Sequence, residues 1–293
     1  MTVRESFAIA ADGTRLYVRE RAGLRGRLTT ILCDGICCDG YIWKYLWDDL
    51  APLTQLCHWH YRGHGRSAPP HDADRIDIPT HADDLDRIRH HIGDGPVVLV
   101  GHSMGCQVVL EAFRRRAEKI QGLVLLCGSS GQLTHTFHGT DLLARVLPKL
   151  IQVTETRPGL MRGLWSRIPV QAALKVALTT GEVDKKQLDP DDLVPYLEHA
   201  TNMDLLLFLR MLRAAGAYSA DEFLQTVDVP ALVIAGTADK FTPYHLAEQM
   251  ARSLPRGELV AVSNATHVAA LEQRDLVGRI VLTFLTERIE ATP

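Results

Sequence analysis

Short apolar runs alternate with amphipathic segments along the first third of this 293-residue chain. The runs are typical of buried strands, and apolar residues recurring every three or four positions predict helices packed on one face. The predicted elements are a hairpin over 4–20 with its turn at Asp12-Gly13, strands at 29–33, 54–60, 97–100 and 123–127, and helices at 41–50, 80–92 and 106–113. This alternation predicts an α/β fold with a mostly parallel central sheet flanked by helices.

The pattern changes after Gly128. Residues 131–220 contain no strand pattern, whereas amphipathic helical segments recur at 142–151, 160–165, 170–178, 193–199 and 204–214. Strands at 231–235 and 258–262 and helices at 243–254 and 271–287 then resume the first pattern. We therefore expect an α/β core of residues 1–130 and 221–293 with an inserted all-helical cap over 131–220. A separate binding domain is the weaker interpretation, because the sheet pattern resumes directly afterwards.

Composition and charge narrow the class of protein. Hydrophobic residues make up 46% of the chain and charged residues 23%, as in globular proteins with a sizeable core. The net charge of −3 provides no bulk attraction to nucleic acid or to an anionic membrane. The basic run Arg114-Arg115-Arg116 is interpreted as a helix C-terminus rather than a phosphate site. We expect no signal peptide and no membrane span, and hence a cytoplasmic protein whose six cysteines, the neighbours Cys37 and Cys38 included, are unpaired thiols. The sequence does not indicate an oligomeric state.

The pentapeptide Gly101-His102-Ser103-Met104-Gly105 joins a predicted strand to a predicted helix. A G-x-S-x-G sequence in this context is typical of a nucleophile elbow, which exposes the serine hydroxyl at a tight turn. Small flanking residues allow the turn, and amide groups at the start of the helix can stabilise a negatively charged oxygen. Ser103 is therefore the candidate nucleophile.

A serine hydroxyl needs a base within hydrogen-bond reach, and the base needs an orienting acid. Asp239 follows a predicted strand directly, and His267 lies in the loop before the final helix. The order serine, acid, histidine is the order of elbow-bearing folds. Asp239 as a plain turn or cap residue is the alternative; Asp228 precedes its strand and His245 falls within a predicted helix, which makes both weaker candidates.

These segments, together with Arg62–Ser67, resemble the α/β-hydrolases of the large lid-bearing branch over nearly the whole chain. The resemblance implies the α/β-hydrolase fold and catalysis without cofactor or metal. It also implies the following site: catalytic Ser103, Asp239 and His267; an oxyanion hole made by the backbone N–H groups of Ile36 and Met104; and substrate contacts at Asp34, Gly35 and His102.

Two positions depart from the family pattern. Asp34-Gly35 stands where a His-Gly pair is usual, and a carboxylate pointing inward would oppose a developing oxyanion. We favour the interpretation that Asp34 hydrogen-bonds loop amides and shapes the turn. His60 stands where Asp is frequent, with His58 and His64 nearby; we favour packed or hydrogen-bonded histidines over a metal site, because no carboxylate completes the set.

The predicted cap is rich in leucine and also contains Met161, Trp165, Met203, Phe208 and Met211. Most of these side chains are expected to pack the cap itself, and some are expected to face the space above the nucleophile. We therefore expect a small-molecule substrate with an apolar portion.

The hypothesis from the sequence is a serine hydrolase that cleaves a carboxylic ester, lactone or thioester through an acyl-enzyme on Ser103. A serine at the elbow disfavours epoxide hydrolase and haloalkane dehalogenase chemistry, since similar enzymes of those types carry aspartate there. Carbon–carbon bond hydrolases and cofactor-free perhydrolases share the triad and remain alternatives. The alternative from another class is a non-enzymatic small-molecule receptor on the same fold, which Asp34 favours.

Overall fold

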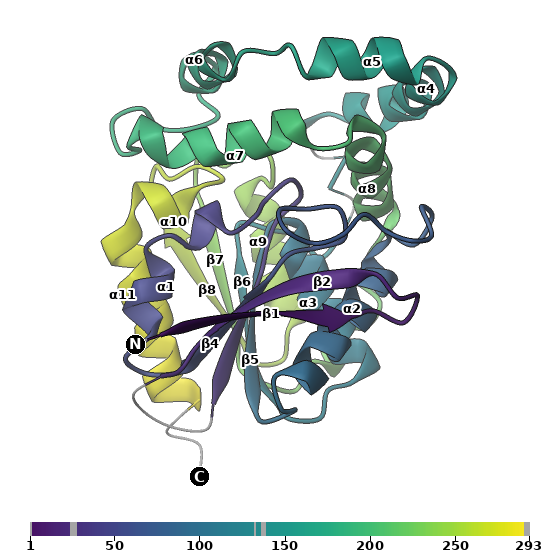
Figure 1. Ribbon diagram of the computed structural model, residues 1–293. Coiled ribbons are helices and arrows are strands. Elements are labelled where there is room, and N and C mark those ends of the chain that lie inside the picture. Colours follow the sequence, from purple (N-terminus) through teal and green to yellow (C-terminus); the bar gives the residue numbers. More distant parts are fainter. Residues whose placement is uncertain (1, 24–27, 132, 136–138, 290–293) are drawn as a thin grey trace.

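A single eight-stranded sheet organises the computed structural model, which describes residues 2–23, 28–131, 133–135 and 139–289 (Figure 1). The strands are β1 (Val3–Ile9), β2 (Arg15–Arg21), β3 (Thr29–Cys33), β4 (Gln55–Trp59), β5 (Val97–His102), β6 (Ile120–Leu126), β7 (Ala231–Gly236) and β8 (Gly257–Val262). Their order across the sheet is β1-β2-β4-β3-β5-β6-β7-β8. The β1–β2 and β2–β4 pairs are antiparallel and the other pairs are parallel, which confirms the predicted hairpin and the mostly parallel sheet.

Helices cover both faces of the sheet, because its central strands alternate between two cores. In β5, Val97 and Leu99 belong to the core under α2, α3 and α9, whereas Val98 and Val100 belong to the core under α1, α10 and α11. These helices are α1 (Leu46–Leu50), α2 (Ile78–His91), α3 (Met104–Arg115), α9 (Tyr244–Ser253), α10 (Ala269–Glu272) and α11 (Arg274–Phe284). Short 3₁₀ segments at Tyr41–Trp43 and Leu224–Thr226 and a π-helical turn at Leu285–Ile289 complete the core.

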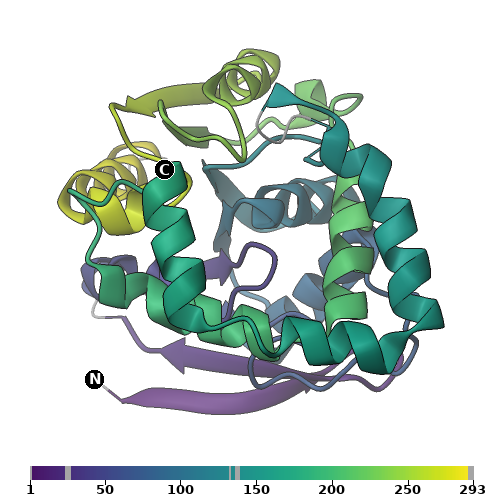
Figure 2. The ribbon, with the colours of Figure 1, turned by 90° about the horizontal axis from the view of Figure 1, so that it is seen from above.

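Among the described residues, five α-helices lie between β6 and β7: α4 (Leu142–Thr156), α5 (Pro158–Trp165), α6 (Val170–Thr180), α7 (Pro190–Asn202) and α8 (Leu205–Ala217). We call them the helical insert. Figure 1 shows α7 lying across one end of the sheet, with α5 and α6 farther out. Figure 2 looks down on the insert. Pro158, Pro169 and Pro190 lie at helix starts, whereas Pro148 and Pro195 lie inside α4 and α7.

Two predicted helices differ from the structure. The segment 41–50 divides into a 3₁₀ turn and α1, and at the junction Lys44 and Tyr45 both contact the Asp192 carboxylate of the insert. The predicted final helix divides into α10 and α11 at Gln273, whose φ of −125° leaves the helical range. In both places the tertiary contacts or the local backbone override an apolar periodicity that continues through the break.

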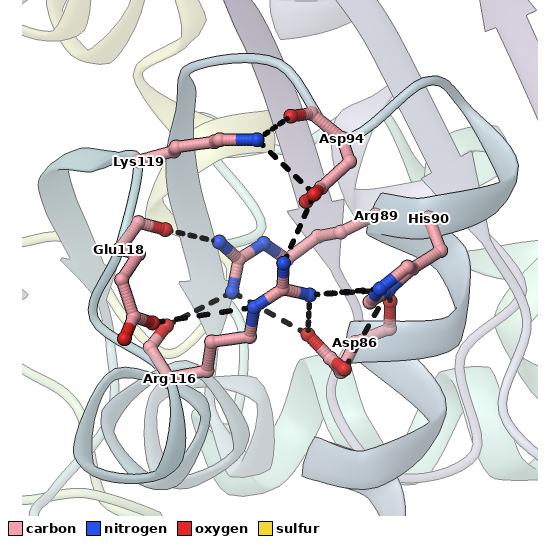
Figure 3. A network of polar contacts seen from close by, with 7 residues as sticks. All are labelled: Asp86, Arg89, His90, Asp94, Arg116, Glu118 and Lys119. Carbon is pink, nitrogen blue, oxygen red and sulfur yellow. Dashed lines mark hydrogen bonds and ion pairs between the residues drawn. The ribbon is translucent and has the colours of Figure 1, made fainter.

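The predicted helix C-terminus at Arg114-Arg115-Arg116 is confirmed. Arg114 and Arg115 lie in the last turn of α3, and Arg116 follows it. Figure 3 shows Arg116 forming ion pairs with Asp86 and Asp94, beside Arg89. This network precedes β5 and β6 in the chain, so it lies at the end of the sheet opposite the elbow. None of the helices in the described ranges has the length and hydropathy needed to cross a bilayer.

Candidate active site

Ser103 lies at the sharp turn between β5 and α3, with φ 55° and ψ −120°. This conformation is strained for a residue with a side chain and is typical of a nucleophile elbow. Two glycines make the turn possible: a Cβ at Gly101 would overlap the backbone of Gly105, and a Cβ at Gly105 would overlap the carbonyl oxygen of Cys33. The turn therefore presents Ser103 at the carboxyl end of β5, where it lines two adjoining cavities.

Asp239 and His267 form a hydrogen-bonded pair beside this turn. Asp239 follows β7, and its Oδ2 accepts a hydrogen bond from Nδ1 of His267 over 2.8 Å. Its Oδ1 accepts the amide N–H groups of Phe241 and Thr242, and the Thr242 hydroxyl donates to Oδ2 over 2.7 Å. Burial raises the pKa of Asp239, but His267 and the bonds from Thr242 outweigh burial and hold that pKa below its usual value. The ionised carboxylate fixes the proton of His267 on Nδ1 and leaves Nε2 as the basic nitrogen.

Ser103 and His267 line the same cavity of about 240 Å³. The Phe241 ring stacks on the His267 ring at a centroid distance of 5.0 Å. His102 Nε2 donates a hydrogen bond to the backbone oxygen of His267 over 3.0 Å. Burial, followed by the nearby His267, lowers the pKa of His102 to about 3, so His102 stays neutral. Within the described ranges the Ser103 hydroxyl forms no hydrogen bond, as is frequent for catalytic groups without substrate.

The loop after β3 passes over Ser103 at close range. A Cβ added to Gly35 would lie 3.1 Å from both the Ser103 Cβ and the His102 Nδ1. Ile36 lines both cavities, and Met104 is the first residue of α3. The structure therefore brings Gly35, Ile36, His102 and Met104 together around Ser103.

Asp34 differs from the expectation that it contacts substrate. Its side chain is fully buried, and it accepts hydrogen bonds from Trp43 Nε1 over 2.6 Å and lies 2.8 Å from His58 Nε2. The carboxylate thus binds two side chains from neighbouring elements rather than the loop amides that we favoured. Its backbone oxygen accepts the Tyr61 hydroxyl over 2.8 Å. Asp34 therefore holds the loop after β3 through contacts in the protein interior.

The three histidines discussed as a metal site instead have separate structural contacts. His64 donates from Nδ1 to the Arg62 carbonyl over 2.9 Å and accepts the Cys37 N–H at Nε2 over 3.2 Å. Burial lowers the pKa of His64 to about 4. His60 accepts the Arg66 N–H over 2.8 Å, and His58 pairs with the carboxylate described above. In the part of the chain that the structure describes, no group of three or more potential ligands could hold a metal ion.

A larger cavity of about 460 Å³ opens from Ser103 toward the insert. Its walls are almost entirely apolar side chains of α4, α5 and α8, together with Ile36, Tyr196 and Phe241, which also line the smaller cavity. The side chains from the insert helices α4, α5 and α8 are Leu143, Leu150, Met161, Trp165, Leu205, Phe208, Leu209 and Leu212. An apolar space beside Ser103 is therefore present.

The five cap residues singled out from the sequence divide between two roles. Met161, Trp165 and Phe208 line the larger cavity, whereas Met203 and Met211 are buried in the core. Sequence reasoning missed the leucines of α8 as cavity residues, although positions 205, 208, 209 and 212 have the spacing of one helix face. It also missed Phe241 and Tyr196, for which the sequence contains no comparable signal.

Comparisons with known proteins agree with this geometry. The model of the family described as alpha/beta hydrolase family matches residues 33–279, so the chain belongs to that family. The chain is 27% identical, over 89% of its length, to the polyketide synthase ThaQ of Burkholderia thailandensis, of whose length it spans only 12%. It is 26% identical to the uncharacterized hydrolase YugF of Bacillus subtilis, with 68% of each chain covered.

Among solved structures, an esterase from Exiguobacterium antarcticum superposes with a TM-score of 0.77 at 19% identity, covering 97% of this chain and 100% of the other. At that identity the likeness concerns the fold. Together with the family match it identifies an enzyme of the hydrolase class on the α/β-hydrolase fold.

Proposed function

We propose that this protein is a serine hydrolase that cleaves a carboxylic ester, lactone or thioester through an acyl-enzyme on Ser103. The observation that carries the proposal is the Asp239–His267 pair, bound over 2.8 Å, whose histidine lines the same cavity as a serine on a strained elbow. His267 Nε2 accepts the Ser103 proton as the hydroxyl attacks the carbonyl. Asp239 holds the imidazole in that tautomer and stabilises the imidazolium. Backbone N–H groups of Ile36 and Met104 bind the oxyanion.

The reaction closes in a second step. His267 returns its proton to the leaving oxygen or sulfur, which departs and leaves the acyl group on Ser103. His267 then takes a proton from water as that water attacks the acyl-enzyme, and the acid is released with Ser103 restored. The Asp34 carboxylate faces away from this site, so its charge is no obstacle to the oxyanion.

The two cavities suggest which side of the ester occupies which space. The leaving group receives its proton from His267, so it has to lie on the side of His267. Only the smaller cavity is lined by His267. The acyl chain therefore extends into the larger apolar cavity, and the insert, residues 131–220, acts as a lid over it.

The volume sets the size of the acyl chain. A methylene group needs about as much room as a liquid water molecule, about 30 Å³. A space of about 460 Å³ therefore accommodates a chain of roughly eight to twelve carbons once imperfect packing is allowed for. Each buried methylene adds about 0.8 kcal/mol, which is roughly a fourfold gain in kcat/KM.

Labelling with a fluorophosphonate tests the chemistry. We expect mass spectrometry to find the label on Ser103, and we expect Ser103→Ala to lose both the label and the turnover of activated esters. An unlabelled wild type, or a ligand-binding protein without turnover, would favour the receptor alternative. Turnover confined to carbon–carbon substrates or to peroxide-dependent bromination would favour the other triad chemistries.

A series of p-nitrophenyl esters tests the acyl assignment. We expect kcat/KM to rise with acyl length and then level off. Leu150→Trp narrows the larger cavity and should lower the ratio of decanoate to acetate turnover about tenfold. Val146→Trp adds the same ring to α4 at a position outside the cavity lining and serves as the matched control. Equal ratios in the two variants would contradict the assignment.

A further inference from the structure

The outer helices of the insert expose large apolar side chains. On α4, Leu142, Val146 and Leu150 recur every four residues and are 64%, 41% and 36% exposed. On α5, Leu160 and Leu164 are 54% and 57% exposed. Most exposed large hydrophobics of the described residues lie between positions 142 and 176, so this surface differs from the rest of the molecule. We call the exposed face of α4, α5 and α6 the outer face.

Helix α5 has two neighbouring pairs of apolar side chains. Met161 and Trp165 line the larger cavity, whereas Leu160 and Leu164, which lie about 100° away around the helix, are exposed. None of its residues is buried. Apolar side chains that form a patch on a protein surface are frequently covered by another protein or by lipid. Leu160 and Leu164 therefore expose apolar surface to water that contact with another apolar surface would bury.

The outer face is also basic, although the whole chain carries a net charge of −3. Between positions 141 and 176 the only acidic residues are Asp141 and Glu155, and these form ion pairs with Arg145 and Arg210. Five further basic residues of this stretch are exposed and form no ion pair within the described ranges: Lys149, Arg157, Arg162, Arg167 and Lys175. Exposed leucines interspersed with unpaired cations are typical of helices that lie on anionic lipid.

The position of the outer face connects it with the active site. Figure 1 shows α5 and α6 farther from the sheet than α7, and Figure 2 shows these helices together on the side that faces away from the sheet. The larger cavity lies beneath α4 and α5, and Leu150 is both partly exposed and part of the cavity lining. Helices α4 and α5 thus carry both the exposed apolar side chains and part of the wall of the cavity that reaches Ser103.

We propose that the outer face docks on an anionic lipid surface, from which an apolar ester enters the larger cavity. The docking step is independent of the proposed chemistry and goes beyond it. A second copy of the chain suits this face less well, because a two-fold interface would bring the five unpaired cations of each copy against those of the other.

Flotation of the full chain with lipid vesicles tests the proposal. We expect binding to vesicles of equal parts phosphatidylcholine and phosphatidylglycerol, and at least tenfold weaker binding to phosphatidylcholine alone. Each Lys or Arg close to an anionic surface strengthens binding about fivefold, which corresponds to about 1 kcal/mol. Added salt should weaken the binding, because it screens exposed charges. Ser103→Ala should bind as the wild type does, which separates docking from catalysis.

The double variant Leu160→Glu, Leu164→Glu should bind anionic vesicles at least about 100-fold more weakly, since it removes two inserting side chains and adds two repelled charges. Leu276→Glu on α11, at a leucine that is 36% exposed and remote from the outer face, is the matched control and should bind normally. Hydrolysis of a short soluble ester verifies that the double variant is folded.

Three results would overturn the proposal: no binding of the wild type, undiminished binding of the double variant, or a wild-type dimer that the double variant dissociates without any vesicle binding. Vesicle binding without ester turnover would instead count against the proposed chemistry alone.

Discussion

The buried Asp34 carboxyl makes a quantitative prediction. Burial raises the pKa of Asp34 from 3.8 to about 7, even though nearby positive charge and the Trp43 bond act in the opposite direction. Asp34→Asn removes the charge and keeps both contacts: the amide oxygen accepts from Trp43 Nε1, and the amide nitrogen donates to His58 Nε2. His58 then carries its proton on Nδ1, which has no hydrogen-bond partner in the described part of the protein.

The expected effect follows from proton binding. Because the pKa is raised in the folded protein, the folded state holds this proton between about pH 4 and pH 7 while the unfolded chain releases it. The Asp34 contribution to the free energy of unfolding therefore falls as the pH rises through this window and is constant above it. At about 1.4 kcal/mol per unit, the loss is on the order of 4 kcal/mol. Burial lowers the pKa of His58 well below its usual value, but His58 is present in both proteins and its contribution cancels in the comparison.

Urea unfolding followed by far-ultraviolet circular dichroism measures the difference. We expect the stability of Asp34→Asn relative to the wild type to rise by on the order of 4 kcal/mol from about pH 4 to about pH 7 and then to level off. Asp34→Ala is the control: it also lacks the titrating carboxyl but leaves the Trp43 and His58 groups unpaired, so at every pH it should be less stable than Asp34→Asn by about 1–3 kcal/mol for each group. A difference between Asp34→Asn and wild type that does not change with pH would refute the reasoning, because it would mean that Asp34 titrates alike in both states.

Three further substitutions test the framework around the site. Arg62→Met should destabilise the protein by about 3–5 kcal/mol in urea unfolding, since it strands the buried Asp84 carboxylate, and adding Asp84→Asn should recover part of the loss. Arg89→Met removes the buried guanidinium that donates to two backbone carbonyls, those of Arg116 and Glu118, in the loop between α3 and β6 (Figure 3) and should lower stability by about 2 kcal/mol, seen as a reduced Tm. Gly105→Ala should yield little folded protein, because its Cβ meets the backbone of β3, whereas Gly159→Ala, with open space around it, should fold normally in the same expression test. A stable Arg62→Met, an unchanged Tm for Arg89→Met, or equal yields of the two alanine variants would each contradict the respective argument.

The fold could be predicted from the sequence because apolar residues are spaced differently in its strands and in its helices. Apolar runs such as Val97–Val100 remain distinguishable from the helical spacing that follows, and glycines mark the elbow between them. The positions of Asp239 and His267 after their strands placed both at one edge of a parallel sheet, where the structure joins them by a hydrogen bond.

The direction of the Asp34 side chain could not be predicted in the same way. It depends on partners from two other elements, Trp43 on the 3₁₀ turn and His58 on β4, and nothing in the local sequence indicates that these three meet. A change from the usual histidine is compatible with the proposed chemistry because the loop would supply a backbone N–H there, and the side chain points into the core. The departure therefore bears on stability and its pH dependence more than on the oxyanion.

The insert shows why apolar spacing alone leaves the partner of a helix face open. The leucines of α8 and those of α5 both follow helical spacing, yet the α8 set lines a cavity and Leu160 and Leu164 project outward. Net charge has the same weakness, since −3 over the chain conceals a basic stretch on one surface. Only the structure shows that α4 and α5 carry both exposed leucines and part of the wall of the larger cavity, with the unpaired cations on these helices or on the segments next to them. That coincidence connects substrate entry to a lipid surface, and neither the spacing nor the charge would have suggested it separately.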